Sequence, residues 1–239
     1  MSTVNVNAID KESGSTLTLG GSGTAVTLHA SATASGFGLN SVQVFTSSGS
    51  WTRPTGVTKV LMFVTGAGGG GGAAVASTGS GGGGSSSGTA IKFLDVSSIS
   101  TSTITVGTGG SGGTGGGFND GATGGTSSWA DGTNTVQATG GTGGKYNSWA
   151  NVNPTNPTGG DLNIPGANGG WGSTMQSRTT AASSFWGGGG PAGGADAGNH
   201  NGQDGRVYGS GGGGGTETNT STDNGGAGAP GVVYILEFK

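Results

Sequence analysis

The segment Lys59-Val-Leu-Met-Phe-Val-Thr-Gly-Ala-Gly-Gly-Gly-Gly-Gly72 joins two different kinds of sequence. Its first half, Lys59–Thr65, is rich in β-branched and apolar residues and predicts a β-strand. Its second half is a glycine run, which has almost no side chains that could be buried in a core. A second apolar segment, Gly231–Lys239, also predicts a strand. The two strands bracket the glycine-rich region, and they favour a folded module over a disordered linker.

The glycine content determines how such a module can be stabilised. Glycine supplies 61 of the 239 residues, while only 29% of residues are hydrophobic and 8% are charged. Ordering the backbone costs roughly 1–2 kcal/mol per residue, and glycine loses the most freedom. Because glycine has no side chain to bury, compensation must come from backbone hydrogen bonds and close backbone packing. The composition therefore predicts a fold held largely by its main chain.

The glycine runs favour one backbone conformation. They follow no strict Gly-X-Y register and prolines number only six, which disfavours a collagen helix. A polyproline-II-like helix, with three residues per turn, is the alternative. It makes no internal hydrogen bonds, but glycine lets several such helices approach and bond laterally. We expect φ of about −75° and ψ of about +145° in the runs, with hydrogen bonds between them.

Periodicity predicts the remaining secondary structure. Besides the two strands above, strands are expected at 41–45, 89–94 and 102–106. No segment repeats apolar residues at i, i+3, i+4 and i+7, so essentially no α-helix is expected. The predicted fold is all-β, a β-sandwich-like glycine-rich domain with a polyglycine-II helix bundle. This domain is expected to span residues 41–239.

Residues 1–40 differ from the rest of the chain. Ser15–Gly20 and Thr24–His29 each alternate apolar with polar residues across a glycine-rich turn, which predicts two short strands. Strands this short are not stable alone. We therefore expect a β-structured attachment or oligomerisation segment that pairs with other chains as a homotrimer. A flexible leader peptide is the alternative.

Charge and composition exclude several classes of partner. The net charge is −3, and the eight Lys and Arg residues are scattered singly, so we expect no nucleic-acid binding. No cysteine is present, which excludes disulfides and thiolate metal sites. No secretory signal is recognisable, and the longest apolar run is far shorter than the roughly 20 residues of a membrane helix. A soluble chain made in the cytoplasm, without membrane insertion, is expected.

Catalytic and cofactor motifs have little support. Gly-x-Gly-x-x-Gly patterns occur, but no helix or Gly-Lys-Ser/Thr follows them, so nucleotide binding is not predicted. No Gly-x-Ser-x-Gly elbow lies between a strand and a helix. His200, with Asp196 and Asp204 nearby, suggests a cation site, but a hydrated turn is the simpler interpretation. We expect no enzyme, no cofactor and no metal site.

Aromatic residues in the polar insertions between glycine runs are the candidates for recognition. They either cap the bundle and form small cores, or protrude with Asn and Asp to bind sugars or outer-membrane loops. At least one of the insertions 145–157 and 171–186 is expected to form an exposed loop at the end of the domain away from residue 1. The candidate receptor-binding residues are Tyr146, Trp149, Trp171 and Trp186.

One stretch resembles a known family. Phe45–Gly72 combines an aromatic, a short polar hairpin, Trp-Thr-x-Pro-x-Gly-Val, an apolar strand and a glycine run. This order resembles the opening of the glycine-rich domains of bacteriophage tail-fibre proteins. The similarity extends over about residues 41–239, through Phe93-Leu-Asp-Val96 and Gly-Ala-Pro-Gly-Val-Val-Tyr-Ile235. T-even-type adhesins, which stack polyglycine-II helices and contact the receptor through distal loops, are similar in a looser way.

The resemblance implies a function. It suggests a virion protein, a tail-fibre or tail-tip component exposed on the outside of the particle, that contributes to host receptor recognition. Its partners would be other tail or fibre proteins and a bacterial surface receptor, either an outer-membrane protein or a glycan. A purely structural fibre or decoration protein is one alternative. An ice-binding or matrix protein is another, for which a flat face of regular Thr or Ala without aromatic loops is expected.

Overall fold

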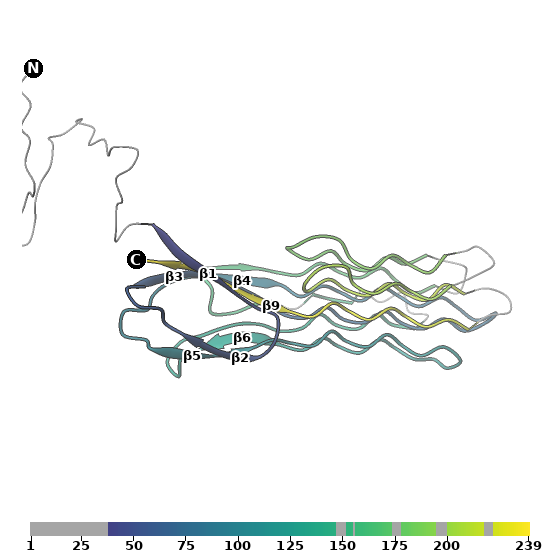
Figure 1. Cartoon of the computed structure of the whole chain (residues 1–239). Helices are drawn as coiled ribbons and strands as arrows, with labels where there is room; N and C mark the ends of the chain where they lie inside the picture. The colour runs from purple at the N-terminus through teal and green to yellow at the C-terminus, as the bar shows by residue number, and fades with distance from the viewer. Residues whose placement is uncertain (1–37, 147–151, 155, 174–177, 195–199, 218–221) are drawn as a thin grey trace, which may run out of the picture. The chain divides into compact units, whose positions relative to one another are not determined.

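The computed structural model describes residues 38–146, 152–154, 156–173, 178–194, 200–217 and 222–239 (Figure 1). The chain divides into the units Met1–Gly36 and Phe37–Lys239, and all described residues belong to the second. They contain nine strands and no helix, which confirms the all-β prediction. The strands are β1 (Leu39–Phe45), β2 (Gly49–Thr52), β3 (Lys59–Thr65), β4 (Thr89–Asp95), β5 (Thr101–Thr105), β6 (Ser127–Ala130), β7 (Thr135–Ala138), β8 (Leu162–Ile164) and β9 (Val232–Phe238). The strands expected in 15–20 and 24–29 lie outside the described residues.

The strands form two antiparallel sheets. The first has the order β1-β9-β3-β4-β8, and the second has the order β2-β5-β6-β7. The two strands that bracket the glycine-rich region in sequence, β3 and β9, are adjacent in the first sheet, with Phe63 opposite Tyr234. The chain therefore leaves and re-enters the sheet at neighbouring positions, and the glycine-rich segments project from its end (Figure 1).

A compact apolar core lies between the sheets. Alternate β3 residues Val60, Met62 and Val64 are fully buried, as period-two alternation requires. The two largest buried side chains, Trp51 and Trp129, lie with their ring centroids 6.3 Å apart. Trp129 lies on β6, which is one of four short strands that were not predicted, the others being β2, β7 and β8. This ring is part of the core and not a surface group.

One acidic side chain is completely buried in this core. Glu237 on β9 has no exposed surface. Its Oε1 accepts hydrogen bonds from Trp51 Nε1 and Gln43 Nε2, each at 2.7 Å, and its Oε2 accepts one from Ser41 Oγ. The carboxyl group thereby connects the edge strand β1 to β2 of the opposite sheet.

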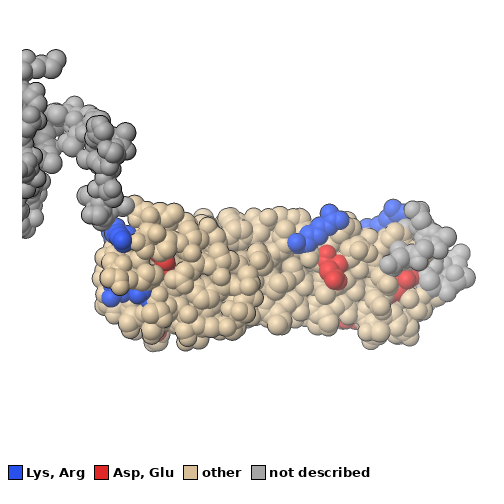
Figure 2. All heavy atoms as spheres, viewed as in Figure 1, with Lys and Arg blue, Asp and Glu red and all other residues tan. Residues whose placement is uncertain are grey.

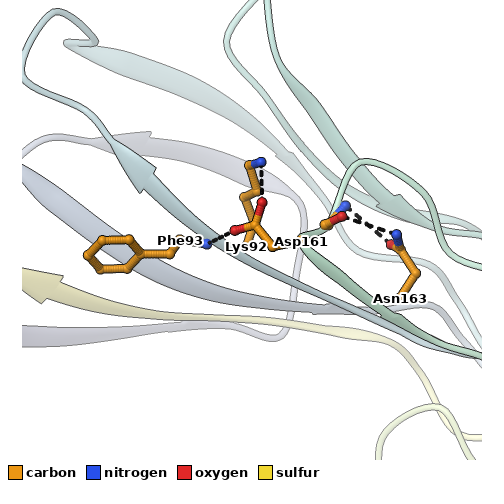
Figure 3. A network of polar contacts seen from close by, with 5 residues as sticks. Lys92, Phe93, Asp161 and Asn163 are labelled. Atoms are coloured by element: carbon orange, nitrogen blue, oxygen red, sulfur yellow. Dashed lines mark hydrogen bonds and ion pairs between the residues drawn. The ribbon is translucent and has the colours of Figure 1, made fainter.

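A second acidic residue attaches the short strand β8 to the sheet. Asp161 accepts hydrogen bonds from Lys92 Nζ at 2.6 Å and from the Phe93 amide at 2.9 Å (Figure 3). The hydrogen bonds from Lys92 and from the Phe93 backbone hold the pKa of Asp161 below its ordinary value. Asn163 closes the adjoining turn through Gly160. These side-chain hydrogen bonds add to the few backbone hydrogen bonds that a strand of only three residues can form.

Beyond the sheets the glycine runs form a hydrogen-bonded bundle. Residues 64–74 are all buried, although most of them have almost no side chain. The run donates in rotation to three neighbours, namely 222–231 from Gly68 and Gly71, 80–88 from Gly69 and Gly72, and 119–126 from Gly70 and Ala73. It accepts hydrogen bonds from three other runs, namely 107–114, 139–145 and 210–217. Three acceptor runs plus three donor runs make six neighbours around one central run.

The rotation explains why these positions are glycine. A Cβ at Gly68 would lie 1.9 Å from the Ser210 carbonyl oxygen, and one at Gly71 would lie 1.9 Å from that of Gly213. Gly68 and Gly71, three residues apart, thus face the same neighbouring run, 210–217. This spacing is the period of a helix with three residues per turn. None of residues 68–72 has a positive φ, so close approach and not backbone freedom requires glycine here. The expected hydrogen bonds between runs are present, while the polyglycine-II dihedral angles stay a prediction.

Candidate functional site

The turns at the end of the bundle away from the sheets carry several of the candidate aromatic residues. The run 66–74 leaves β3 and turns at Val75–Gly79, where Val75 N–H and Gly79 O pair. The next run begins at Ser80 and returns toward β4. Figure 2 shows that most of the visible face of this domain carries no charged side chain. The turns at the end away from the sheets do carry charged side chains, among them Lys145, Asp120 and Glu217.

Tyr146 lies at this far end and pairs with Phe118. The Tyr146 backbone forms a bridge with Gly81, and its ring lies 4.8 Å from that of Phe118 at an interplanar angle of 49°. Phe118 is 69% exposed, whereas Tyr146 is half-buried. Burial raises the pKa of the Tyr146 phenol, and the nearby Glu217 carboxylate adds to this rise. Tyr146 thus supports an exposed Phe118 ring.

Asp120 fixes the turn that carries this pair. Its Oδ1 accepts a hydrogen bond from the Tyr146 amide and its Oδ2 pairs with Lys145 Nζ, both at 2.8 Å. Phe118 is one of the aromatic residues in the polar insertions, but it was not among the four candidate receptor-binding residues. The positive φ of Gly116, 88°, marks a turn two residues before it. An aromatic residue directly after a glycine run and its turn was the available signal.

Trp171 lies at the same end and is 50% exposed. Its neighbour Ser173 forms a bridge with Ser80, at the start of the run 80–88. Gly82 N–H donates to Lys145 O and Gly83 N–H donates to Gly170 O, so the segments carrying Tyr146 and Trp171 both flank the run 80–88. We call Phe118, Tyr146 and Trp171 the distal aromatic surface. Trp149, the fourth candidate, lies outside the described residues.

The structure places Trp186 elsewhere, beside the sheets. Its Nε1 donates to Thr65 Oγ1 at 2.9 Å, and its ring lies 6.2 Å from Phe63 and 6.1 Å from Tyr234. Those two residues belong to β3 and β9. Trp186 therefore does not join the distal aromatic surface. It forms one wall of an open pocket of about 510 Å³, together with Gly205, Arg206, Val207, Tyr208, Ala229 and Pro230.

Two residues of the suggested cation site, His200 and Asp204, have hydrogen-bond partners of their own. His200 Nδ1 lies 2.6 Å from Gly194 O, and Asp204 Oδ1 accepts a hydrogen bond from the Ala227 amide at 2.7 Å. Asp196, the third residue of the suggested cation site, lies outside the described part of the chain. Among the residues that can be placed, no group of three His, Cys, Asp or Glu side chains could hold a metal ion. The same residues include no helix long and apolar enough to span a bilayer.

The two sheets, the six-neighbour glycine core and the aromatic turns define a class of protein, an all-β domain whose interior is mainly glycine backbone. The family model described as "Glycine-rich domain" matches residues 41–236, and the chain belongs to this family. No curated protein matches the chain. The division at residue 40 stays a prediction.

Proposed function

We propose that this chain is a bacteriophage virion structural protein, a tail-fibre or tail-tip component that contributes to host receptor recognition on the outside of the particle. The sequence resemblance of residues 41–239 to phage tail-fibre domains motivates the proposal. The observation that carries it is the distal aromatic surface, where Phe118 and Trp171 are exposed at the turns of a buried main-chain bundle. The proposed role is binding and structural, with no enzymatic activity and no cofactor.

The bundle supports this role for a physical reason. Its runs are joined by backbone hydrogen bonds, so the exposed ring of Phe118 is not needed to hold the runs together. Exposed aromatic rings are the side chains that contribute most to protein interfaces. An outer-membrane protein or a surface glycan could therefore be bound by these turns without a cost to the fold.

Cell binding tests this proposal. Labelled full-length protein is expected to bind host cells and to lose binding on receptor-deficient derivatives of the same strain. The single variants Phe118→Ala and Trp171→Ala should each lose about 2 kcal/mol of binding free energy, because exposed aromatic anchors dominate binding. This loss corresponds to a dissociation constant about 30-fold higher. Leu39→Ala is the control, since Leu39 is 53% exposed but lies on β1 and belongs to none of the surfaces proposed to bind a partner. Wild-type binding by both distal variants would contradict the proposal.

Two other roles predict different results. A purely structural fibre or decoration protein would not bind cells at all. An ice-binding or matrix protein would use a flat face of regular small residues, and the exposed rings of Phe118 and Trp171 count against this alternative. If the distal variants bound cells as tightly as the wild type does, neither alternative would be supported. Recognition would then be placed on another surface.

We also propose that copies of this chain associate as a homotrimer, and the outer face of the β1-β9-β3-β4-β8 sheet supports this. Cross-strand partners lie on one face of a sheet, and two apolar rows run across it. The first row is Val42, Leu236, Leu61 and Phe93, and the second is Val44, Tyr234, Phe63, Ile91 and Leu162. Of these, Val42, Val44, Phe93 and Leu162 are 42–55% exposed.

The size of this face fits an interface between copies. Five strands at about 4.8 Å spacing, up to seven residues long at about 3.3 Å per residue, present roughly 500 Å². In a trimer the three faces would meet around the three-fold axis, so each face would be shared between two neighbouring copies. Lys59 and Asp95 lie opposite each other beside the first row. Trp186 of the same chain packs on Phe63 and Tyr234 of the second row, so the exposed residues of both rows would make the contact with another copy.

Sedimentation of the full-length chain tests the association. The wild-type protein is expected to sediment as a trimer, and the double variant Val42→Glu, Phe93→Glu as a smaller species, because two charges would be buried without partners. Phe118→Glu, an equally polar change at the distal end, should leave the mass unchanged. A monomeric wild-type protein, or a double variant that remains trimeric, would refute the use of this face.

A further inference from the structure

The pocket beside Trp186 has the features of a small-molecule site. Its volume of about 510 Å³ lies within the range of roughly 300–1,000 Å³ that is typical of ligand pockets. Three segments far apart in sequence line it, namely the loop at Trp186, residues 205–208 and residues 229–230. Most of the lining is apolar, and Arg206 is its one charged side chain. This composition, apolar walls with a single directional polar group, is what ligand sites commonly show.

Hydrogen bonds hold the three segments in place. Ser184 Oγ donates to Tyr208 O at 2.6 Å, which ties the Trp186 loop to the segment that carries Tyr208. Gly209 N–H donates to Pro230 O at 2.8 Å, and this bond ties the same segment to the third wall. The pocket is therefore preorganised, so a ligand would not have to order its walls.

The indole of Trp186 is also held in one orientation. Its Nε1 donates inward to Thr65 Oγ1, which in turn shares a 2.7 Å hydrogen bond with the buried Thr89 hydroxyl. Because the polar edge of the ring is used in this way, the ring offers the pocket an apolar surface. Tyr208, 37% exposed, contributes a second ring. Two rings on separate segments favour a ligand that has a flat apolar side.

Arg206 supplies the polar part of the site. Its side chain is exposed, and no ion pair to it is found within the placed parts of the chain. The nearby Asp204 carboxylate is directed to the Ala227 amide, and no acidic residue lines the pocket. A guanidinium group binds a carboxylate through two parallel hydrogen bonds, a geometry that an ammonium group cannot provide.

We propose that this pocket binds an acidic sugar, a pyranose that carries a carboxylate. The C–H face of the sugar packs on Trp186 and Tyr208, and the carboxylate pairs with Arg206. This site is separate from the distal aromatic surface, and it does not depend on the virion assignment. A free anion would pair only with Arg206, and a neutral sugar would pack only on the two aromatic rings. The combination of the two features selects a ligand that has both.

Titration calorimetry and ligand-observed NMR with the full-length chain test this site. The probes are glucuronate, glucose and inorganic phosphate. Glucuronate is expected to bind at least about tenfold more tightly than either of the other two, because each lacks one half of the recognised chemistry. Arg206→Gln and Tyr208→Ala should each weaken glucuronate binding at least about tenfold. The affinity of Arg206→Lys for glucuronate should lie between those of Arg206→Gln and the wild type. Lysine keeps the positive charge but cannot form two parallel hydrogen bonds with a carboxylate.

Arg178→Gln is the matched control, since Arg178 is also exposed but does not line the pocket. It should bind glucuronate as the wild type does, and all variants should melt at the wild-type temperature. Absence of glucuronate binding would overturn the proposal. So would glucose binding as tight as that of glucuronate, or phosphate binding of equal strength that Tyr208→Ala leaves unchanged. Glucuronate binding that survives Arg206→Gln would place the sugar elsewhere and would also overturn it.

Discussion

Replacing Gly71 by alanine is expected to destabilise the domain by at least about 3 kcal/mol, a larger effect than most surface or core substitutions produce. The added Cβ would lie 1.9 Å from the carbonyl oxygen of Gly213 and 2.5 Å from its carbon. The obstacle is backbone and not a flexible side chain. Gly213 cannot move away easily, because its own N–H donates to Gln203 O at 2.8 Å. Denaturant unfolding of the full-length chain measures the loss.

Gly188→Ala is the control for this experiment. A Cβ at Gly188 would meet no atom within 4 Å, and its φ is not positive. Alanine there should change the free energy of unfolding by less than about 1 kcal/mol, and a small gain is expected because the unfolded chain loses freedom. Equal stability of Gly71→Ala and Gly188→Ala would contradict the conclusion that packing between runs requires glycine.

Glu237→Ala is expected to cost about 3 kcal/mol of unfolding free energy. The change removes the acceptor of two 2.7 Å hydrogen bonds, from Trp51 Nε1 and Gln43 Nε2, and of a third from Ser41 Oγ. Trp51 has no exposed surface, so its N–H would lose its partner without access to water. A buried donor left unpaired costs about 1–3 kcal/mol, and hydrogen bonds to a charged group are among the stronger ones.

Glu237→Gln is the matched variant, because it keeps the shape and one carbonyl oxygen. Its loss should be smaller, about 1–2 kcal/mol, since one acceptor remains for the Trp51 indole. Thermal unfolding gives the order of the three proteins, and the indole N–H resonance of Trp51 reports directly on the hydrogen bond. If alanine and glutamine at this position proved as stable as glutamate, the buried network would make no net contribution.

The sequence by itself determined the class of fold. Lys59–Thr65 and Val232–Phe238 were recognisable as strands because alternation and β-branched residues are local signals, and the structure places both in the middle of one sheet. The glycine runs required a core of hydrogen-bonded backbone, since they supply no side chains with which to build one. The six neighbours of the run 66–74 agree with that requirement.

Only the tertiary structure decided where the aromatic residues lie. Trp129 and Trp186 occur in insertions similar to those of Tyr146 and Trp171, yet Trp129 is core and Trp186 lies beside β3 and β9. The end at which a turn lies depends on whether the preceding run leaves the sheets or returns to them. Composition does not encode that direction, because a glycine run that leaves the sheets has the same composition as one that returns to them. It is set by which carbonyl each N–H meets in neighbouring runs, and those partners are distant in sequence.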